Sequence, residues 1–418
     1  MQIPKYFSNY NAPSLKPYLN LGIRTISLVL KFLFLLFLGK YSIDESNLGV
    51  YGIFNSSIGF SIYLIGFEYY VYISRAIAQD KSKVVQIKNQ VLFYIISYLL
   101  FVPAILFVVF SNDFLDVSYI WLFIIILISE HAAQECFRLL SLFKKPIKAN
   151  LVLLIRNIWI IVSIIYFVVA SDMDLKRFFL FWAVSSFSGL LLGIYFLSFQ
   201  ISFVKIWNGR INLREIWKGI GVSMYFFISS LGIQTILLSG RFFLDYHFDK
   251  AVVGIYTFYS SIVSLIEVVI YNMVVMMLFP YLLENADSDE KVFSKYVSKF
   301  KKQIYGLTVL SIAGAALLMP ILLFILEKKS TSDNIIIFYI MLLGALAYNL
   351  SLIPHYIMYA RKKERFILFS TLIAVILNII VNYFFIPANS LMGASLGYTI
   401  AMVFLFLAKF RFNKKSES

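Results

Sequence analysis

The sequence is poor in the residues that build disulfides and metal sites. It has one cysteine, Cys136, and three histidines, His131, His247 and His355. A single cysteine excludes an internal disulfide and any metal site built from several cysteines. The three histidines lie on different segments, without the spacing of metal ligands. We therefore expect neither a metal centre nor another cofactor.

Signatures of catalysis and of ATP binding are also missing. No GxxxxGK[ST] segment is present to hold nucleotide phosphates, and no nucleophile is paired with a base in a pattern typical of catalysis. The polar connections reach about two dozen residues at most, which is too short for a separate catalytic or nucleotide-binding domain. The sequence therefore predicts a protein that is not an enzyme and is not driven directly by ATP.

Charged residues are scarce. They make up 14% of the 418 residues, whereas apolar residues make up 61%; soluble domains have roughly 25% and 45–50%. Apolar runs of about 20 residues recur along the whole chain, and each can cross roughly 30 Å of hydrocarbon. The composition therefore predicts an all-α polytopic membrane protein rather than a soluble protein with a large core.

Twelve apolar runs are bounded by polar segments. In the first half of the chain they cover residues 19–39, 48–72, 91–110, 118–141, 150–170 and 178–198. In the second half they cover residues 219–239, 251–280, 304–326, 335–360, 366–386 and 391–408. Proline and glycine occur inside several runs, but neighbouring helices can satisfy the freed backbone groups in a membrane bundle. We expect about twelve transmembrane helices.

Basic residues alternate from one connection to the next. Of the 37 lysines and arginines, 27 fall in the terminal segments, in alternate connections and in the span ends beside them, whereas seven lie on the opposite side. Cytoplasmic loops are enriched in lysine and arginine, so both termini are predicted to face the cytoplasm from a cytoplasmic (inner) membrane. The net charge of +15 has the same origin, and we expect no nucleic-acid partner.

Two segments half a chain apart are similar. GVYGIFNSSIGF (49–60) begins the second run, and GIYTFYSSIVSL (254–265) begins the eighth, 205 positions later. Both segments follow an odd-numbered run, so they have the same orientation in the membrane. The sequence therefore predicts a parallel repeat about an axis along the membrane normal. We expect two six-helix lobes, residues 1–206 and 207–418.

Three basic residues lie within the predicted runs: Arg24, Lys31 and Arg156. A cation in hydrocarbon costs about 3 kcal/mol, so each of them needs a physical reason. Lys31 lies about twelve residues, or ~18 Å, into the first run, near the bilayer centre. Arg24 lies two turns earlier on the same helix face. These cations either line a cavity or form structural ion pairs, and Arg156, nearer a span end, has snorkelling to the headgroups as a further alternative.

Two deep carboxylates are candidates for ion coupling. Glu130 lies in SEHAAQECFR, where Gln134 and Arg138 follow on the same helix face. Glu267 is the only charge in the interior of the eighth run. A carboxylate in a membrane either handles a proton or cation or neutralises a basic residue of another helix, and the sequence leaves both roles open. Glu68, nearer a span end, is expected at headgroup level.

Three stretches resemble spans of the polysaccharide-export branch of the MOP superfamily. The second span of that family resembles SNLGVYGIFNSSIGF, and its eighth span resembles DKAVVGIYTFYSSIVSLIEVVIYNMVVMMLFPYL, with a G-[IV]-Y opening and a late F-P. Its eleventh and twelfth spans resemble ILNIIVNYFFIPANSLMGASLGYTIAMV, with N-x-x-x-N, I-P and G-A-S. The resemblance is to O-antigen flippases of the Wzx type, and it implies a MATE-like fold of two six-helix lobes that enclose a cavity.

The same resemblance implies a flippase that moves an undecaprenyl-diphosphate-linked oligosaccharide, an O-antigen or related repeat unit, by alternating access. Such a substrate carries a diphosphate and often acidic sugars, which gives the internal cations a purpose. We therefore predict substrate binding by Arg24, Lys31 and Arg156, and ion coupling by Glu130 or Glu267. Expected partners are the lipid-linked oligosaccharide, membrane lipids and the polysaccharide polymerase machinery of lipopolysaccharide biosynthesis.

Two other functions are alternatives. A MATE-type drug/cation antiporter has the same twelve-span layout, but deep cations argue against a cationic substrate. A membrane O-antigen polymerase is an enzyme for which we expect a long periplasmic loop with basic residues. The outward connections of this sequence are short, which disfavours the polymerase.

Overall fold

The computed structural model describes residues 15–41, 45–78, 83–170, 174–286, 289–361 and 363–415. Within these ranges the regular elements are all helices, and no strand is present. In chain order they are α1 (Leu15–Tyr41), α2 (Ser46–Gly66), α3 (Tyr69–Ala78), α4 (Lys83–Ser111), the 3₁₀ turn η1 (Val117–Tyr119), α5 (Ile120–Leu142), α6 (Pro146–Asn157), α7 (Trp159–Ala170), α8 (Leu175–Ser198), α9 (Phe203–Asn208), α10 (Leu213–His247), α11 (Lys250–Ile270), the π-helical turn η2 (Tyr271–Val275), α12 (Met276–Glu284), α13 (Glu290–Leu326), α14 (Lys329–Asp333), α15 (Ile335–Ala360) and α16 (Glu364–Lys415).

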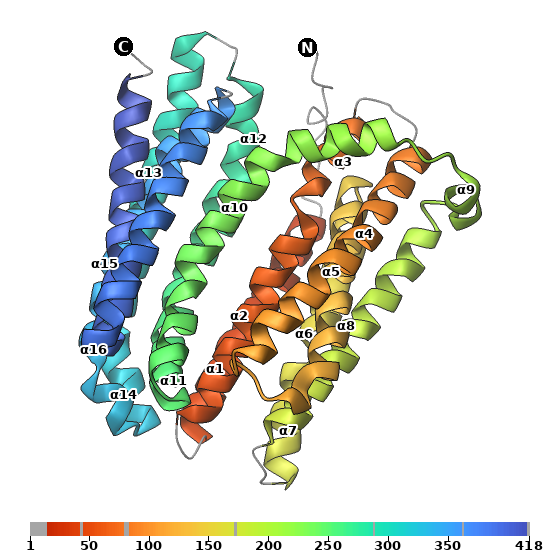
Figure 1. Cartoon of the computed structure of the whole chain (residues 1–418). Helices are drawn as coiled ribbons and strands as arrows, with labels where there is room; N and C mark the ends of the chain where they lie inside the picture. Colours follow the sequence, from red (N-terminus) through yellow and green to blue (C-terminus); the bar gives the residue numbers. More distant parts are fainter. Residues whose placement is uncertain are drawn as a thin grey trace.

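Figure 1 shows these helices as two side-by-side groups, α1–α8 and α10–α16, which we call the first and second lobes. The end of the bundle at which α1 begins and α16 ends is called the terminal face, and the opposite end, with α14, is called the distal face. The short helix α9 connects the two lobes along the chain at the terminal face. The predicted boundary between residues 206 and 207 falls within α9 and stays a prediction.

The twelve predicted runs all fall on helices, so the all-α polytopic fold is confirmed. Ten spans among the described residues are long and apolar enough to cross a membrane. Helix α1 adds 27 residues, about 40 Å of helix. Helix α16 is one of the ten although it contains two of the predicted runs. The described residues therefore hold about twelve helices that are able to span a membrane.

Helix α16 folds back on itself. Its 52 residues are interrupted at Ser390, where φ is 46°. Gly397 lies so close to the Asn382 side chain that an added Cβ would collide with it, whereas in a straight helix these residues are about 22 Å apart. The two halves of α16 therefore form an antiparallel pair. The turn predicted between residues 386 and 391 is confirmed.

The second predicted run is interrupted rather than continuous. Helix α2 ends at Gly66, and Phe67 and Glu68 both have a φ of 51° before α3 begins at Tyr69. The ring of Phe67 stacks on Phe227 of α10, with 4.0 Å between the ring centroids, so the break lies against the second lobe. As a result Glu68 is buried in the bundle, at 8% exposure, and the expectation that it lies at headgroup level stays a prediction.

Two helices of the second lobe are longer than predicted. Helix α10 has 35 residues and reaches His247, whereas the predicted run ended at residue 239. Helix α13 has 37 residues, about 56 Å of helix, which exceeds the ~30 Å thickness of the hydrocarbon. Its lysine-rich first turns therefore extend beyond the hydrocarbon at the terminal face.

Helices α2 and α11 cross between the lobes through reciprocal contacts. A Cβ on Gly49 would collide with the carbonyl of Lys250, and a Cβ on Gly254 would collide with that of Glu45. Gly49 and Gly254 are equivalent positions of the sequence repeat, and so are Glu45 and Lys250. This exchange of equivalent residues indicates an approximate two-fold axis between the lobes. Glycine allows the close approach because it has no side chain.

Candidate functional site

Glu130 of α5 is buried in the first lobe, and its carboxylate is surrounded by donors. Arg156 of α6 donates to Oε2 from Nε, at 3.1 Å, and from Nη2. From α8, the Trp182 indole donates to Oε1 at 3.0 Å, and the Ser186 hydroxyl donates to the same atom at 2.6 Å. Charge-assisted hydrogen bonds of this kind are the strong ones, so they fix the positions of the carboxylate and the guanidinium.

Arg156 is turned into the first lobe and does not reach out to the headgroups. It lies in the last turn of α6 and forms an ion pair with Glu130. Gly189 of α8 leaves room for its side chain, because a Cβ there would lie 2.6 Å from Arg156 Cγ. Pairing with a residue of another helix was one of the roles left open for both groups. Their predicted roles in substrate binding and ion coupling stay predictions.

Lys31 of α1 points away from the lipid-facing side of its helix. Val29 and Leu33 form an exposed apolar face of α1, and at 100° per residue Lys31 points about 160° away from both. The Lys31 side chain is itself exposed, so it faces open space rather than the core. Its ammonium group interacts electrostatically with Glu130 and Arg156.

These three charges, Lys31, Glu130 and Arg156, are called the first-lobe cluster. They come from α1, α5 and α6, and the formal charges of two basic side chains and one acidic side chain sum to +1. Arg24 precedes Lys31 by seven residues on α1, but its side chain lies outside the described part of the structure. The structure therefore brings together three of the five residues predicted for the site.

Glu267 lies in the second lobe, apart from the first-lobe cluster. It is 8% exposed, and Oε1 accepts a hydrogen bond from the Tyr398 hydroxyl of α16 at 2.8 Å. Among the residues that the structure describes, no cation forms an ion pair with it, so of the two roles left open for Glu267 the pairing with a deep cation is not seen there. Glu267 lies one turn before the π-helical turn η2, a kind of distortion that is frequent at functional sites.

A second carboxylate of α5 has a structural partner. Glu135 accepts hydrogen bonds from Gln90 at 2.9 Å and from Tyr94 at 2.8 Å, and it forms an ion pair with Arg138 at 2.5 Å. The Arg138 guanidinium also lies over the ring of Tyr70, 3.8 Å from the ring centroid. The Glu135 carboxylate is therefore held by partners from α4 and α5, and these contacts stabilise the terminal end of the first lobe.

Two buried cations were missed by the sequence analysis. Arg241 of α10 is 6% exposed, and its guanidinium donates hydrogen bonds to both lobes. Lys409 of α16 is 2% exposed, and its Nζ lies 3.1 Å from Nδ1 of His355. Both lie just beyond the predicted ends of their spans, at residues 239 and 408, and were counted as loop or terminal residues. The signal that could have found Arg241 is the apolar FFLDYHF that follows it, which continues the helix to His247.

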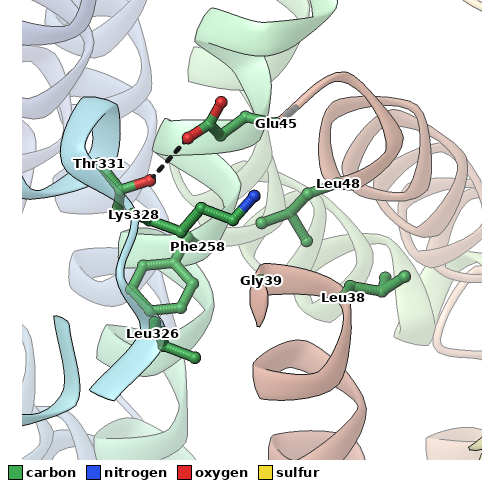
Figure 2. Close-up of a pocket in the computed structure, with 8 residues that line it drawn as sticks. All are labelled: Leu38, Gly39, Glu45, Leu48, Phe258, Leu326, Lys328 and Thr331. Carbon is green, nitrogen blue, oxygen red and sulfur yellow. Dashed lines mark hydrogen bonds between the residues drawn. The ribbon is translucent and has the colours of Figure 1, made fainter. Parts of the chain in front are cut away.

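Contacts at the distal face join the two lobes. Glu45, at the start of α2, accepts a hydrogen bond from Thr331 of α14 at 3.2 Å, as Figure 2 shows. Lys250 of α11 donates to the carbonyl of Phe114 at 2.7 Å. The pocket in Figure 2, beside Thr331 and Lys328, has a volume of about 10 Å³, close to that of one water-sized sphere. The lobes are therefore closed against each other at this face.

Contacts at the terminal face come largely from the connection between the lobes. Tyr72 of α3 donates to the carboxylate of Glu215, in the first turn of α10. The backbone amide of Asn212 donates to Asn89 of α4 at 3.0 Å. The first turns of α10 therefore lie across the end of the first lobe, as Figure 1 shows above α3.

No group of three or more potential metal ligands occurs among the described residues.

Comparison with known proteins gives structural matches only: no family model matches the chain, and no curated protein sequence does. An inward-facing multidrug resistance MATE family transporter of the MOP superfamily is 15% identical to this chain, with a TM-score of 0.69. The match covers 96% of this chain and 97% of the transporter chain. The lipid II flippase MurJ, in an inward closed conformation, is 16% identical, covering 95% of this chain and 87% of its own, with a TM-score of 0.67. A MOP superfamily transporter from Pyrococcus furiosus is 15% identical, covering 95% of this chain and 93% of its own, with a TM-score of 0.60.

Identities this low show the fold and nothing finer. The matches cover nearly the whole chain, and the proteins matched are transporters and flippases rather than enzymes. The chain is therefore a multi-pass membrane protein with the fold of MOP-superfamily transporters.

Proposed function

We propose that the protein is a flippase that translocates an undecaprenyl-diphosphate-linked oligosaccharide, such as an O-antigen or related repeat unit, across the cytoplasmic membrane. The observation that carries the proposal is the net positive first-lobe cluster, with Lys31 turned away from the lipid-facing side of α1. A cation kept within a membrane favours an anionic substrate, because it offsets the desolvation of the anion. Arg24, on the same stripe of α1, would add a second cation of this kind.

The terminal face is the side proposed to meet the cytoplasm. Basic residues concentrate at this face, for example in the first turns of α13, and cytoplasmic loops are enriched in such residues. Both termini would then be cytoplasmic. Two of the similar structures are named as inward conformations, and the distal contacts of this chain fit a state that is closed to the outside.

The two carboxylates differ in their fitness for ion coupling. Glu130 would have to give up the hydrogen bonds of Arg156, Trp182 and Ser186 before it could bind a proton or a metal cation. Glu267 has one hydrogen bond, from Tyr398, and no cation partner among the described residues. We therefore assign coupling to Glu267 and assign Glu130 the task of orienting Arg156.

A MATE-type drug/cation antiporter is the second candidate. It is favoured by the fold of the MATE family neighbour and by the deep carboxylate Glu267. The first-lobe cluster disfavours it, because a net positive charge repels a cationic substrate. The polysaccharide polymerase machinery stays an expected partner of the flippase, which would receive the translocated unit.

Complementation of a strain that lacks its flippase tests the proposal. The variants are Lys31→Ala and Lys31→Arg, and the matched control is Lys176→Ala, an exposed lysine in the first turn of α8. Surface polysaccharide and intracellular lipid-linked oligosaccharide are both measured, together with the amount of protein in the membrane. We expect Lys31→Ala to abolish surface polysaccharide and to accumulate the lipid-linked unit, with Lys31→Arg and the control active.

Two results would count against the flippase. If wild-type protein restores no surface polysaccharide, a lipid-linked oligosaccharide is the wrong substrate. If Lys31→Ala complements as well as wild type at equal expression, the first-lobe cluster is structural. Efflux of a cationic drug by the wild type would then favour the antiporter.

A further inference from the structure

Arg241 is a buried cation at the crossing of the two lobes. It lies six residues before the end of α10, at the distal end of the second lobe. Nη1 donates to the hydroxyl of Ser56, on α2 of the first lobe, at 2.8 Å. Nη2 donates to the hydroxyl of Ser260, on α11 of the second lobe, at 2.7 Å. Arg241 therefore joins the lobes and belongs to neither core alone.

The charge of Arg241 has no counter-ion among the described residues. Its two hydrogen-bond acceptors are neutral hydroxyls, and Nε is buried without any partner. The titratable groups that interact with it electrostatically are the phenols Tyr51 and Tyr256, and neither is an anion at neutral pH. Burial of an uncompensated charge destabilises a protein, so the charge needs a reason other than stability.

Further donors without partners surround the crossing. The hydroxyls of Ser57 on α2 and Thr257 on α11 are buried and make no hydrogen bond. A hydroxyl can donate to an oxyanion, and a guanidinium binds phosphate and carboxylate oxygens with two parallel hydrogen bonds. The crossing therefore holds donors that suit a phosphate or carboxylate group, and the closed lobes leave them unused.

The position of Arg241 couples these donors to lobe movement. Ser56 belongs to the first lobe, whereas Arg241 and Ser260 belong to the second. Any motion that parts α2 from α10 at the distal face breaks the bond between Nη1 and Ser56. That motion leaves Nη1 and Nε available on the opened side, where an anion can replace the serine.

We propose that Arg241 is a second anion-binding residue of the transport path, which binds the phosphate or carboxylate group of the substrate once the lobes part at the distal face. The inference rests on the proposed function and deepens it. The first-lobe cluster around Lys31 holds the anion on entry, and Arg241 holds it before release. Ser56 takes the place of the anion while the distal face is closed.

The test measures anion binding by the purified full-length chain. The probe is inorganic pyrophosphate, and the readout is the midpoint of thermal unfolding, compared with sodium chloride at equal ionic strength. A ligand that binds the folded state raises this midpoint. Wild type, Arg241→Gln, Arg241→Lys and Ser56→Ala are compared, with Lys31→Gln as the matched variant at the other cation. Undecaprenyl diphosphate in mixed micelles is a second probe, which separates a lipid-borne anion from a free one.

Arg241→Gln is expected to unfold at a higher temperature than wild type without ligand, because the uncompensated charge is gone, and to lose at least half of the pyrophosphate shift. In Lys31→Gln, pyrophosphate is still expected to raise the unfolding midpoint, because Arg241 is intact in this variant. Ser56→Ala is expected to enlarge the shift, because the residue that competes with the anion is removed. Arg241→Lys should keep part of the shift, since a lysine retains the charge but loses the paired geometry.

Two results would count against the inference. If Arg241→Gln lowers the unfolding midpoint and leaves the pyrophosphate shift unchanged, Arg241 is a structural link between helices. An unchanged shift in Ser56→Ala would contradict the exchange of serine for anion. Failure of the proposed function is seen separately, because complementation would then fail for wild type while the shift still depended on Arg241.

Discussion

Buried charge dominates the residue scale. The sequence alone identified Lys31, Arg156 and Glu130 as costly residues in hydrocarbon, because charge within an apolar run is visible without a structure. It did not identify which cation Glu130 binds, since the partners come from helices that are separate in sequence. Arg241 was missed for a different reason, because the predicted span ended at residue 239, two residues before it, whereas its helix continues to His247.

The Glu130–Arg156 pair leads to a prediction about stability. Glu130→Gln keeps the shape of the side chain but leaves the Arg156 guanidinium without its anion. Removing one partner of a buried ion pair costs about 3 kcal/mol, so the purified variant should unfold well below wild type. Thermal unfolding in detergent checks this, with Glu284→Gln, an exposed glutamate at the end of α12, as the control. A variant within about 1 kcal/mol of wild type would contradict the pairing.

At the scale of elements, the spans were predictable but their breaks were only partly so. The turn near Ser390 was expected because IPANS interrupts two apolar runs. The break at Phe67 and Glu68 was not expected, because the single Gly66 before it lies in a continuous apolar run, and tertiary packing on Phe227 of α10 accompanies the positive φ angles. Apolar periodicity reports where a helix can form, and packing decides where it stops.

The crossing of α2 and α11 predicts an effect on lobe movement. In Gly254→Ala the new methyl group collides with the carbonyl of Glu45, so the lobes should close less completely at the distal face. Overpacking costs about 1–3 kcal/mol, which shifts the balance of closed and open states roughly tenfold. The measurement is thiol labelling of Ser56→Cys in a Cys136→Ser background. Gly314→Ala, where no atom lies near the added Cβ, is the control.

Labelling of Ser56→Cys should be faster with Gly254→Ala than with Gly314→Ala. Equal rates for the two variants would show that the crossing tolerates a methyl group. The close approach of Gly254 to Glu45 would then have no part in closing the distal face.

The turn within α16 predicts opposite effects of two substitutions. Ser390 has a positive φ, which glycine adopts freely and β-branched residues adopt only with strain. Ser390→Gly should therefore stabilise the protein by up to about 1 kcal/mol, and Ser390→Val should destabilise it by at least as much. Thermal unfolding of the two purified variants measures the difference. If valine is tolerated as well as glycine, the turn does not hold this conformation.

At the scale of the whole molecule, the span count, the two lobes and the repeat all follow from patterns in the sequence. The apolar runs fix the helices, and the similarity between residues 49–60 and 254–265 appears in the structure as the crossing on the approximate two-fold axis. Substrate identity cannot be predicted in this way. It depends on where a few polar side chains from different helices meet, and the family that the sequence resembles has no strict signature for them.

The orientation of the molecule is a prediction at this scale. In the Cys136→Ser background, Lys295→Cys at the terminal face and Lys176→Cys at the distal face are both exposed sites. A membrane-impermeant thiol reagent added to intact cells, with the outer membrane permeabilised where one is present, should label Lys176→Cys alone. Lys295→Cys should react after the cytoplasmic membrane is permeabilised. The reverse pattern would invert the proposed topology.

The central claim is that a cationic interior carries an anionic, lipid-linked oligosaccharide across the membrane. The most direct measurement is the translocation of a labelled undecaprenyl-diphosphate-linked oligosaccharide in proteoliposomes that contain wild type, Lys31→Ala or no protein. We predict that wild type exposes the labelled lipid in the second leaflet well above the protein-free rate, and that Lys31→Ala reduces this rate at least tenfold, the effect of about 1.4 kcal/mol. Translocation by wild type no faster than in protein-free liposomes, combined with uptake of a cationic drug, would contradict the claim.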